Sequence, residues 1–405
     1  MFKMVKLLLN MTGLKMKLVV IGFGQCGGRI ADEFARLNAR ARMYRRIEIV
    51  TGAYAVNTDA ADLTGLSAIR SDYKHRILIG GRKTGGHGVG KINELGAEIA
   101  REDSDKIIDA IRTTPHFLES DAFLLVASAA GGTGSGSLPI ITQLIKERHA
   151  DKPVYDLVIL PFEHEENTEE RTVYNSATCL KSTSAVADAV ILVDNQRYVR
   201  KDSSLRNNMA RINALMVEPF YNLLCAGEEK KRKHIGAKVL DAGDILQTIV
   251  GWTAIGYGRA LLSLIPPLRQ TRNFRDKSTE THKGIRAMDE ALSELSLTCN
   301  PREANRALYL LSAPAREMNM ELVKELGDYL RDIAPKAIIR NGDYPRQRGE
   351  LDVTIILSEL DSVDKVKNYY CKSTEVIEVI KKKQAELTGK LKDIDEAAKD
   401  IPSLL

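Results

Sequence analysis

The stretch Ala129-Ala-Gly-Gly-Thr-Gly-Ser-Gly136 decides the fold. It follows a continuous apolar run, Ala122–Ala127, and precedes a segment whose apolar residues recur at helical spacing. In that segment we expect Ser137 as the N-cap and Pro139 in the first turn. Such a loop offers a row of unhindered backbone N–H groups and two hydroxyls at a helix N-terminus, which favours binding of phosphate.

A second glycine-rich loop, Gly22-Phe-Gly-Gln-Cys-Gly-Gly28, follows the apolar run Lys17–Ile21 and opens a predicted helix over Arg29–Leu37. Alone, this GxGxxG pattern is equally typical of dinucleotide-binding folds. Two such loops more than one hundred residues apart favour a nucleoside triphosphate held between two helix N-termini. The sequence has no GxxxxGK[ST] motif, so backbone N–H groups and Mg²⁺ would have to neutralise the phosphates.

The first half of the chain alternates strand and helix patterns, and this predicts an α/β fold with a Rossmann-like parallel sheet covered on both faces. Ligands of such sheets bind at the carboxyl ends of the strands. Further strands are predicted at Ile47–Val56, Arg76–Ile79, Val154–Leu160 and Ala189–Val193. A long helix over Ser203–Gly227 and a charged loop over Glu228–His234 lead to a smaller α/β domain, with strands at Arg306–Leu311, Ala337–Ile339 and Leu351–Leu357.

We divide the chain into five segments on these patterns. They are an N-terminal extension (1–15), a nucleotide-binding domain (16–202), a central helix and charged loop (203–235), a second domain (236–360) and a helical tail (361–405). Within the tail, apolar residues recur three and four positions apart over Val363–Ile394. This segment is either a helix packed on the body of the protein or a seam for an unidentified partner helix.

Composition narrows the class of protein. The 59 basic and 54 acidic residues give a net charge of +5, which does not indicate a nucleic-acid-binding protein. Five scattered cysteines without a CxxC pair argue against a disulfide framework and a zinc ribbon, and we expect a cytoplasmic location. The longest uncharged stretch, Ala122–Ile145, is interrupted by glycine and serine, so no integral membrane segment is predicted.

Two further loops fit a phosphate site. Val56-Asn-Thr-Asp59 ends a predicted strand with polar side chains, and Thr84-Gly-Gly-His-Gly-Val-Gly90 is a third glycine-rich turn. Either loop alone would be ordinary. Together with the first two loops, we expect them to surround the phosphates, with Thr84–Gly90 closing on the terminal one.

At these residues the sequence resembles the tubulin/FtsZ superfamily of GTPases. Gln25–Gly28 is similar to the first loop of tubulin, while Val56–Ala60 and Thr84–Gly90 resemble FtsZ. Ala130–Gly136 resembles the signature GGGTG[ST]G, with Ala130 in place of the first glycine. Together with Gly342-Asp-Tyr-Pro345, this mixture is most similar to CetZ, the archaeal tubulin-like cell-shape proteins, over Met16–Leu360.

The resemblance implies GTP or GDP and Mg²⁺ as cofactors, without naming a protein ligand for the metal. It also implies the residues that contact the phosphates. These are Gly24, Gln25, Cys26, Gly27, Gly28, Arg29, Asn57, Asp59, Thr84, Gly85, Gly86, Ala130, Gly131, Gly132, Thr133, Gly134 and Ser135.

Ribose and base contacts follow from the same resemblance. Glu165 is the match to the acidic residue that contacts ribose, and Glu166 is the second candidate. Asn195 and Asn213 fall where the family approaches the base, and a carboxamide accepts from the guanine N2 amine, which adenine lacks. Met209 stands where the family has a stacking aromatic residue.

Asp241 and Asp244 are the candidate catalytic residues. At i and i+3 at the start of a helix they point the same way, and in isolation the pair would be a helix cap and a dipole-favoured acid. The resemblance implies instead that their loop enters the nucleotide pocket of the next subunit and helps to place the metal and the attacking water. Head-to-tail stacking of this kind does not close on itself, so self-association into protofilaments is expected.

The leading hypothesis is therefore an assembly-activated GTPase that forms filaments and controls cell shape. One alternative is a nucleotide-bound scaffold that does not hydrolyse, favoured by Met209 and by Val239, which replaces an asparagine of FtsZ. A less favoured alternative is an NAD-dependent oxidoreductase using Gly22–Gly27, which would need an isolated acid at the end of the second strand.

Overall fold

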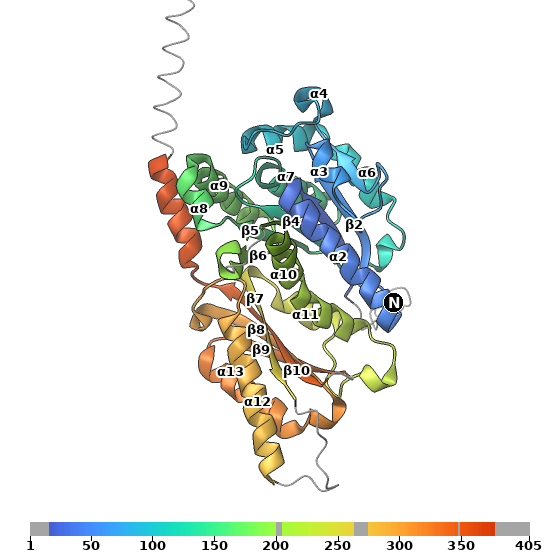
Figure 1. Ribbon diagram of the computed structural model, residues 1–405, viewed down its shortest axis with the longest axis vertical. Helices are drawn as coiled ribbons and strands as arrows, with labels where there is room; N and C mark the ends of the chain where they lie inside the picture. The colour runs from blue at the N-terminus through green and yellow to red at the C-terminus, as the bar shows by residue number, and fades with distance from the viewer. Residues whose placement is uncertain (1–15, 200–204, 263–273, 347–348, 377–405) are drawn as a thin grey trace, which may run out of the picture.

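The computed structural model describes residues 16–199, 205–262, 274–346 and 349–376. Two domains flank a long central helix, α10 (Leu205–Glu228), as Figure 1 shows. The predicted N-terminal extension, most of the predicted tail and the first residues of the predicted central helix lie outside the described residues.

The strands of both domains form one sheet, in the order β3-β2-β1-β4-β5-β6-β7-β10-β8-β9. Neighbouring strands from β3 to β7 pair in parallel, and the β6–β7 pair joins the two domains. Strand β7 then pairs antiparallel with β10. The first domain supplies β1 (Leu18–Phe23), β2 (Val50–Asn57), β3 (Arg76–Leu78), β4 (Ala122–Ser128), β5 (Val154–Leu160) and β6 (Ala189–Asp194). The second supplies β7 (Gly251–Leu261), β8 (Ala304–Ala313), β9 (Ile338–Pro345) and β10 (Glu350–Leu360).

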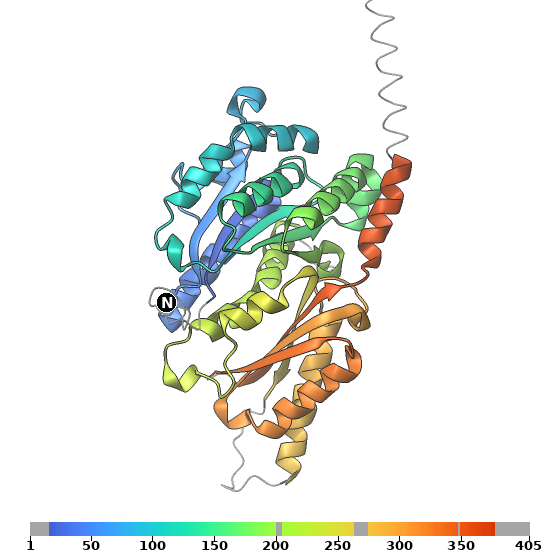
Figure 2. The same ribbon diagram turned by 180° about the vertical axis from the view of Figure 1, so that it is seen from behind.

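Helices cover both faces of the parallel strands, as expected (Figures 1 and 2). One face packs against α2 (Gly24–Arg45) and α10, while α11 (Ala242–Thr248) continues this layer over β8 in the second domain. The other packs against α5 (Asn93–Glu102), α6 (Ser104–Arg112), α7 (Thr133–Arg148) and α9 (Glu170–Val186). Shorter helices are α3 (Ala60–Thr64), α4 (Gly81–Thr84) and α8 (Glu163–Thr168), while α12 (Phe274–Ser293), α13 (Met320–Ile333) and a helix over 364–376 complete the fold.

The start of α7 differs from the prediction. The helix begins at Thr133 inside the glycine loop, so Ser137 is not its N-cap and Pro139 lies beyond its first turn. The reason is close packing of α5 on α7, where a Cβ at Gly136 would overlap the carbonyl oxygen of Asn93. Ser137 is buried at this contact and donates to the Gly96 carbonyl at 3.4 Å.

The predicted charged loop after α10 is also only partly solvated. Its basic residues are exposed, but Glu228, Glu229 and His234 are buried. The Glu229 carboxylate lies 3.6 Å from the Arg45 guanidinium and accepts from the Tyr344 hydroxyl at 3.3 Å. The acidic residues of this segment therefore tie α2 to the second domain, which a run of charged residues did not predict.

Candidate functional site

The predicted loops converge on one cavity of about 310 Å³ at the carboxyl ends of the parallel strands. Every strand from β1 to β6 except β3 is followed by residues that line it. The lining residues are Phe23, Gly24, Gln25, Cys26, Asn57, Asp59, Asp62, Gly88, Lys91, Ser128, Ala130, Gly131, Gly132, Thr133, Gly134, Phe162, Glu165, Asn195 and Met209. The arrangement fits a ligand bound at the edge of an open α/β sheet.

Two helix N-termini meet at this cavity. Helix α2 begins at Gly24 and α7 at Thr133, and the two loops touch, since a Cβ at Gly24 would lie 3.2 Å from the Gly134 nitrogen. Gly24 also has φ 69°, a conformation that favours glycine. Neither helix has a side-chain cap, so the N–H groups of both first turns are available to an anion.

A network of polar side chains forms the wall of the cavity next to the carboxyl end of β2. The Asp62 carboxylate accepts from Gln25 at 2.7 Å and from Asn57 at 3.0 Å. Asp59 caps α3 by accepting from the Ala61 backbone N–H at 2.8 Å. Asp62 was not predicted, although its place three residues after Asp59 is the signal that could have identified it.

The third glycine loop approaches the cavity through different residues from those predicted. Gly88 and Lys91 line the cavity, whereas Thr84, Gly85 and Gly86 are not among its lining residues. The loop is tied to the end of β2, because the Gly88 N–H donates to the Thr58 carbonyl at 3.1 Å and the Gly86 carbonyl accepts from Ala60 at 3.0 Å.

Of the two acidic candidates, the structure brings Glu165 to the cavity and turns Glu166 away from it. Glu165 accepts from the Phe162 backbone N–H at 2.9 Å, which fixes the start of α8. Glu166 instead accepts from the Tyr369 hydroxyl at 2.5 Å and pairs with lysines of the 364–376 helix. Sequence spacing did not separate these two neighbours, because only the direction of α8 decides between them.

Asn195 and Met209 line the cavity, and the unpredicted Phe162 adds an aromatic ring there. Asn213 is buried one turn beyond Met209 on α10 and is not part of the lining. Phe162 follows Pro161 directly after β5, which is visible in the sequence, but the orientation of its ring is not.

The remaining predicted residues shape the loops rather than line the cavity. Arg29 is exposed on α2, Gly27 packs under the Val126 carbonyl and Gly28 packs near Ala55. Ser135 donates its hydroxyl to the Gly131 carbonyl within α7.

Burial raises the pKa of the Cys26 thiol to about 12, and the nearby Glu165 adds to this rise. The thiol is therefore neutral at pH 7. It lies at the cavity as a small apolar group with no nucleophilic thiolate form.

Neither Asp241 nor Asp244 lines the cavity. They lie at the start of α11, which follows α10 after a connection through Arg232–His234. The exposed Asp241 caps α11 by accepting from the Asp244 N–H at 2.7 Å, and the Asp244 carboxylate lies 3.3 Å from Arg340. One carboxylate is thus bonded to the first turn of α11, and the other is paired with β9.

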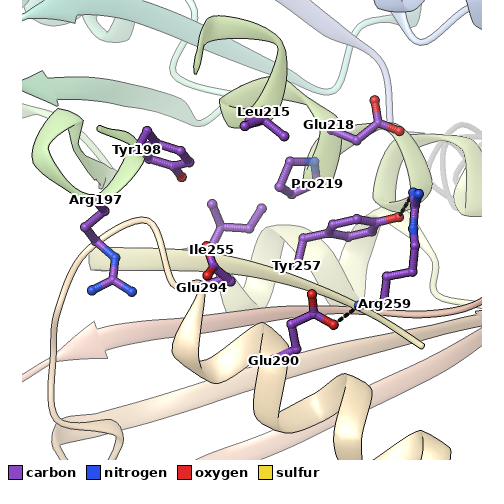
Figure 3. A pocket seen from close by; sticks show the side chains of 10 residues that line it. All are labelled: Arg197, Tyr198, Leu215, Glu218, Pro219, Ile255, Tyr257, Arg259, Glu290 and Glu294. Carbon is purple, nitrogen blue, oxygen red and sulfur yellow. Dashed lines mark hydrogen bonds between the residues drawn. The ribbon is translucent and has the colours of Figure 1, made fainter. Parts of the chain in front are cut away.

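A second cavity of about 320 Å³ lies where α10, β7 and α12 meet (Figure 3). Arg259 on its wall donates to the Tyr257 hydroxyl at 2.8 Å, and its backbone N–H donates to Glu290 at 2.9 Å. None of the sequence candidates lines this cavity.

Two searches cover the described part of the chain. Among those residues, no three His, Cys, Asp or Glu side chains come together as a metal-binding group. Within the same residues, no helix has the length and apolar character needed to cross a membrane.

Comparison with known proteins assigns the class. Residues 17–201 match the GTPase domain of the Tubulin/FtsZ family, and residues 202–375 match the C-terminal domain of tubulin-like CetZ. The chain therefore belongs to the tubulin/FtsZ family of GTPases, and within it to the tubulin-like CetZ proteins. The predicted tubulin/FtsZ fold is confirmed.

Two relatives illustrate this similarity. Tubulin-like protein CetZ1 of Haloferax volcanii is 33% identical over 369 residues, covering 87% of this chain and 90% of that protein. The CetZ of Pyrococcus furiosus is 29% identical over 390 residues, covering 95% and 94%.

Solved structures agree with this assignment. A GDP-bound monomer of CetZ1 from H. volcanii superposes with a TM-score of 0.76 at 30% identity, covering 89% of this chain and 99% of that one. A GTPγS-bound protofilament of CetZ2 from the same organism gives 0.77 at 27% identity, covering 90% and 100%.

Proposed function

We propose that this protein binds GTP or GDP in the cavity described above, stacks head to tail into protofilaments and hydrolyses GTP where two subunits meet. The observation that carries the proposal is the meeting of two uncapped helix N-termini, those of α2 and α7, at one cavity. Such a pair of N-termini binds the charge of a triphosphate without a lysine from a P-loop. The related CetZ1 and CetZ2 structures contain GDP and GTPγS, which supports a guanine nucleotide here.

The parts of the cavity have distinct roles in this proposal. Residues Ala130–Gly134 and Gly24–Cys26 hold the phosphates through backbone N–H groups. Glu165 accepts from the ribose hydroxyls, and Asn195 accepts from the guanine N2 amine. Asn213, buried one turn beyond Met209 on α10, is proposed to support the base side of the cavity.

The cavity also fits Mg²⁺ bound to the phosphates. This ion prefers oxygen ligands and is held by one or two carboxylates together with phosphate and water. Asp59 and Asp62 are the lining carboxylates that would hold it, and it would offset the charge of the phosphates. Asn57 and Gln25 orient the Asp62 carboxylate through their side-chain hydrogen bonds.

Hydrolysis is proposed to need a second subunit. Neither Asp241 nor Asp244 lines the cavity of its own chain, so we infer that they act on the nucleotide of a neighbouring subunit. In a head-to-tail stack the α11 end of one subunit meets the cavity of the next. Asp241 would then orient the attacking water, and most of the rate gain would come from positioning and electrostatics.

The wider role follows from this assembly. Filaments of a tubulin-like protein in the cytoplasm would act on cell shape, and the CetZ2 protofilament supports the stacking. The same proposal includes the domain limits at 16–202, 203–235 and 236–360. It also includes a partner that binds the C-terminal helix.

A second candidate function, a scaffold that binds nucleotide without hydrolysis, is favoured by one observation. Asp244 is paired with Arg340 at 3.3 Å, so it is not free to act on a neighbouring nucleotide unless that ion pair opens.

The test is incubation of the purified protein with GTP and Mg²⁺, followed by light scattering, phosphate release and negative-stain electron microscopy. We expect filaments and phosphate release that both depend on GTP. Filaments with bound GTP and no phosphate release would select the scaffold. Absence of GTP or GDP binding would overturn both functions.

A further inference from the structure

The helix over 364–376 lies beside α8 and α9 (Figures 1 and 2, red). Its buried residues Val366 and Tyr369, and Val363 just before it, join the core cluster on the α9 face of the sheet. Tyr370 and Val376 pack against the same cluster. The helix is therefore part of the folded body over its described length.

Lys365 on this helix bridges two acidic residues from different elements. Its ammonium lies 3.3 Å from the Glu166 carboxylate on α8 and 3.6 Å from the Asp194 carboxylate at the end of β6. Glu166 has a side chain 6% exposed, and Asp194 is also buried. Both carboxylates therefore depend on a nearby cation, because a buried charge without a partner is costly.

The sequence neighbours of these two acids line the nucleotide cavity. Glu165 precedes Glu166, and Asn195 follows Asp194. The bridge is thus one residue away from the proposed ribose contact and one residue away from the proposed base contact.

Further hydrogen bonds make α8 and the turn after β6 a single unit. The Gln196 side chain accepts from the Glu163 N–H at 3.3 Å, and Asp194 accepts from the Gln196 N–H at 3.0 Å. On the other side, the Tyr369 hydroxyl donates to Glu166 at 2.5 Å. Burial raises the pKa of Asp194, and Lys365 opposes this rise.

We propose that Lys365 is a positioning residue for nucleotide binding, which fixes Glu165 and Asn195 by holding Glu166 and Asp194. The inference rests on the proposed function of the cavity. It extends that function to the C-terminal helix, which contributes no residue to the lining of the cavity. By thermodynamic linkage, nucleotide binding and docking of this helix strengthen each other, so a protein partner that pulls on the helix would weaken nucleotide binding.

The test compares GDP affinity, thermal stability and GTP turnover among Lys365→Met, Lys365→Arg and the control Lys367→Met. Lys367 is exposed on the same helix two residues away, so its substitution makes the same change of charge. A polar cavity of about 400 Å³ lined by Glu166 and Lys365 leaves room for the larger arginine.

We expect Lys365→Met to weaken GDP and GTP binding by a similar factor of at least about five, in the range of ordinary coupling between sites. Turnover at saturating GTP should remain close to that of the wild type, and Lys365→Arg should recover most of the affinity. Lys367→Met should bind as the wild type does.

Three results would overturn the inference: equal GDP affinity in Lys365→Met and wild type, an equal loss in Lys367→Met, or no recovery in Lys365→Arg. A merely structural role would lower the melting temperature of Lys365→Met and leave the affinity of the folded protein unchanged. If the wild type itself binds no guanine nucleotide, the proposed function fails instead.

Discussion

Single glycines serve two separable purposes in the cavity loops. A Cβ at Gly27 would overlap the Val126 carbonyl oxygen, so this glycine allows α2 to pack on β4. A Cβ at Gly131 would meet no protein atom within 4 Å, although Gly131 lines the cavity. The first glycine is required by the fold, and the second leaves space in the cavity for the proposed nucleotide.

The substitutions Gly27→Ala and Gly131→Ala should therefore behave differently. Gly27→Ala should lower the free energy of unfolding by about 1–3 kcal/mol, because a backbone oxygen cannot move aside cheaply. Gly131→Ala should leave it within about 0.5 kcal/mol of wild type but weaken GTP binding about tenfold, since the methyl group occupies ligand space. Chemical denaturation and nucleotide titration measure both; equal stability of the two variants would contradict this account.

Asp156 on β5 gives a prediction about pH. It is buried, accepts from the Thr142 hydroxyl at 2.8 Å, and burial raises its pKa well above the usual range. Above about pH 4 the unfolded chain releases this proton while the folded chain keeps it, so the stability of the wild type falls as the pH rises.

Asp156→Asn removes this dependence without changing the shape of the side chain. Its melting temperature should exceed that of the wild type at pH 8, and the difference should be smaller at pH 5. The effect is at most about 1.4 kcal/mol for each pH unit over which only the folded state holds the proton. Calorimetry at both values checks this, and a difference that does not change with pH would refute it.

Several cavity residues could be named from sequence, because glycine loops after strands fix where backbone N–H groups gather. Gly131, Asn57 and Asn195 line the cavity as expected. The placement of Glu166 could not be predicted, since it depends on a lysine about two hundred residues later in the chain.

At the scale of elements, α11 shows how one aspartate serves the fold. Asp241 accepts from the Asp244 N–H at 2.7 Å and caps a helix of seven residues. Asp241→Ala should lower the free energy of unfolding by about 1 kcal/mol, and Asp241→Asn by only a few tenths, because asparagine is an equally good cap. Urea denaturation of the two variants measures this; a loss in Asp241→Asn as large as that in Asp241→Ala, or no loss in either, would contradict the capping role.

The parallel strands were predicted well because each is a continuous apolar run between helices. Strand β7 was not predicted, and its sequence explains why: Gly256 and Gly258 interrupt it. A Cβ at either position would overlap a carbonyl oxygen of α12, that of Ala291 or Ala287. Close packing of α12 therefore requires glycine in this strand, despite the low strand propensity of glycine. This contact is visible only in the folded structure.

At the scale of the whole molecule, the cavity and the candidate catalytic acids belong to different domains. Met209 at the start of α10 lines the cavity, whereas Asp241 and Asp244 at α11 do not. The proposed hydrolysis would therefore need a second copy to bring the acids to the nucleotide. Only the resemblance to the tubulin/FtsZ superfamily predicted this arrangement. The spacing of apolar residues gives no information on how two distant loops are placed relative to each other.

The most direct measurement of this claim is phosphate release from a mixture of Gly131→Ala and Asp241→Asn subunits with GTP and Mg²⁺. Gly131→Ala keeps both acids but has an altered cavity. Asp241→Asn keeps the cavity but lacks one of the two acids. Each alone should release phosphate at least about tenfold more slowly than the wild type. The account predicts that the mixture exceeds the average of the two variants, because the acids of one subunit serve the nucleotide of the other. A mixture no faster than that average, or Asp241→Asn alone as fast as the wild type, would contradict it.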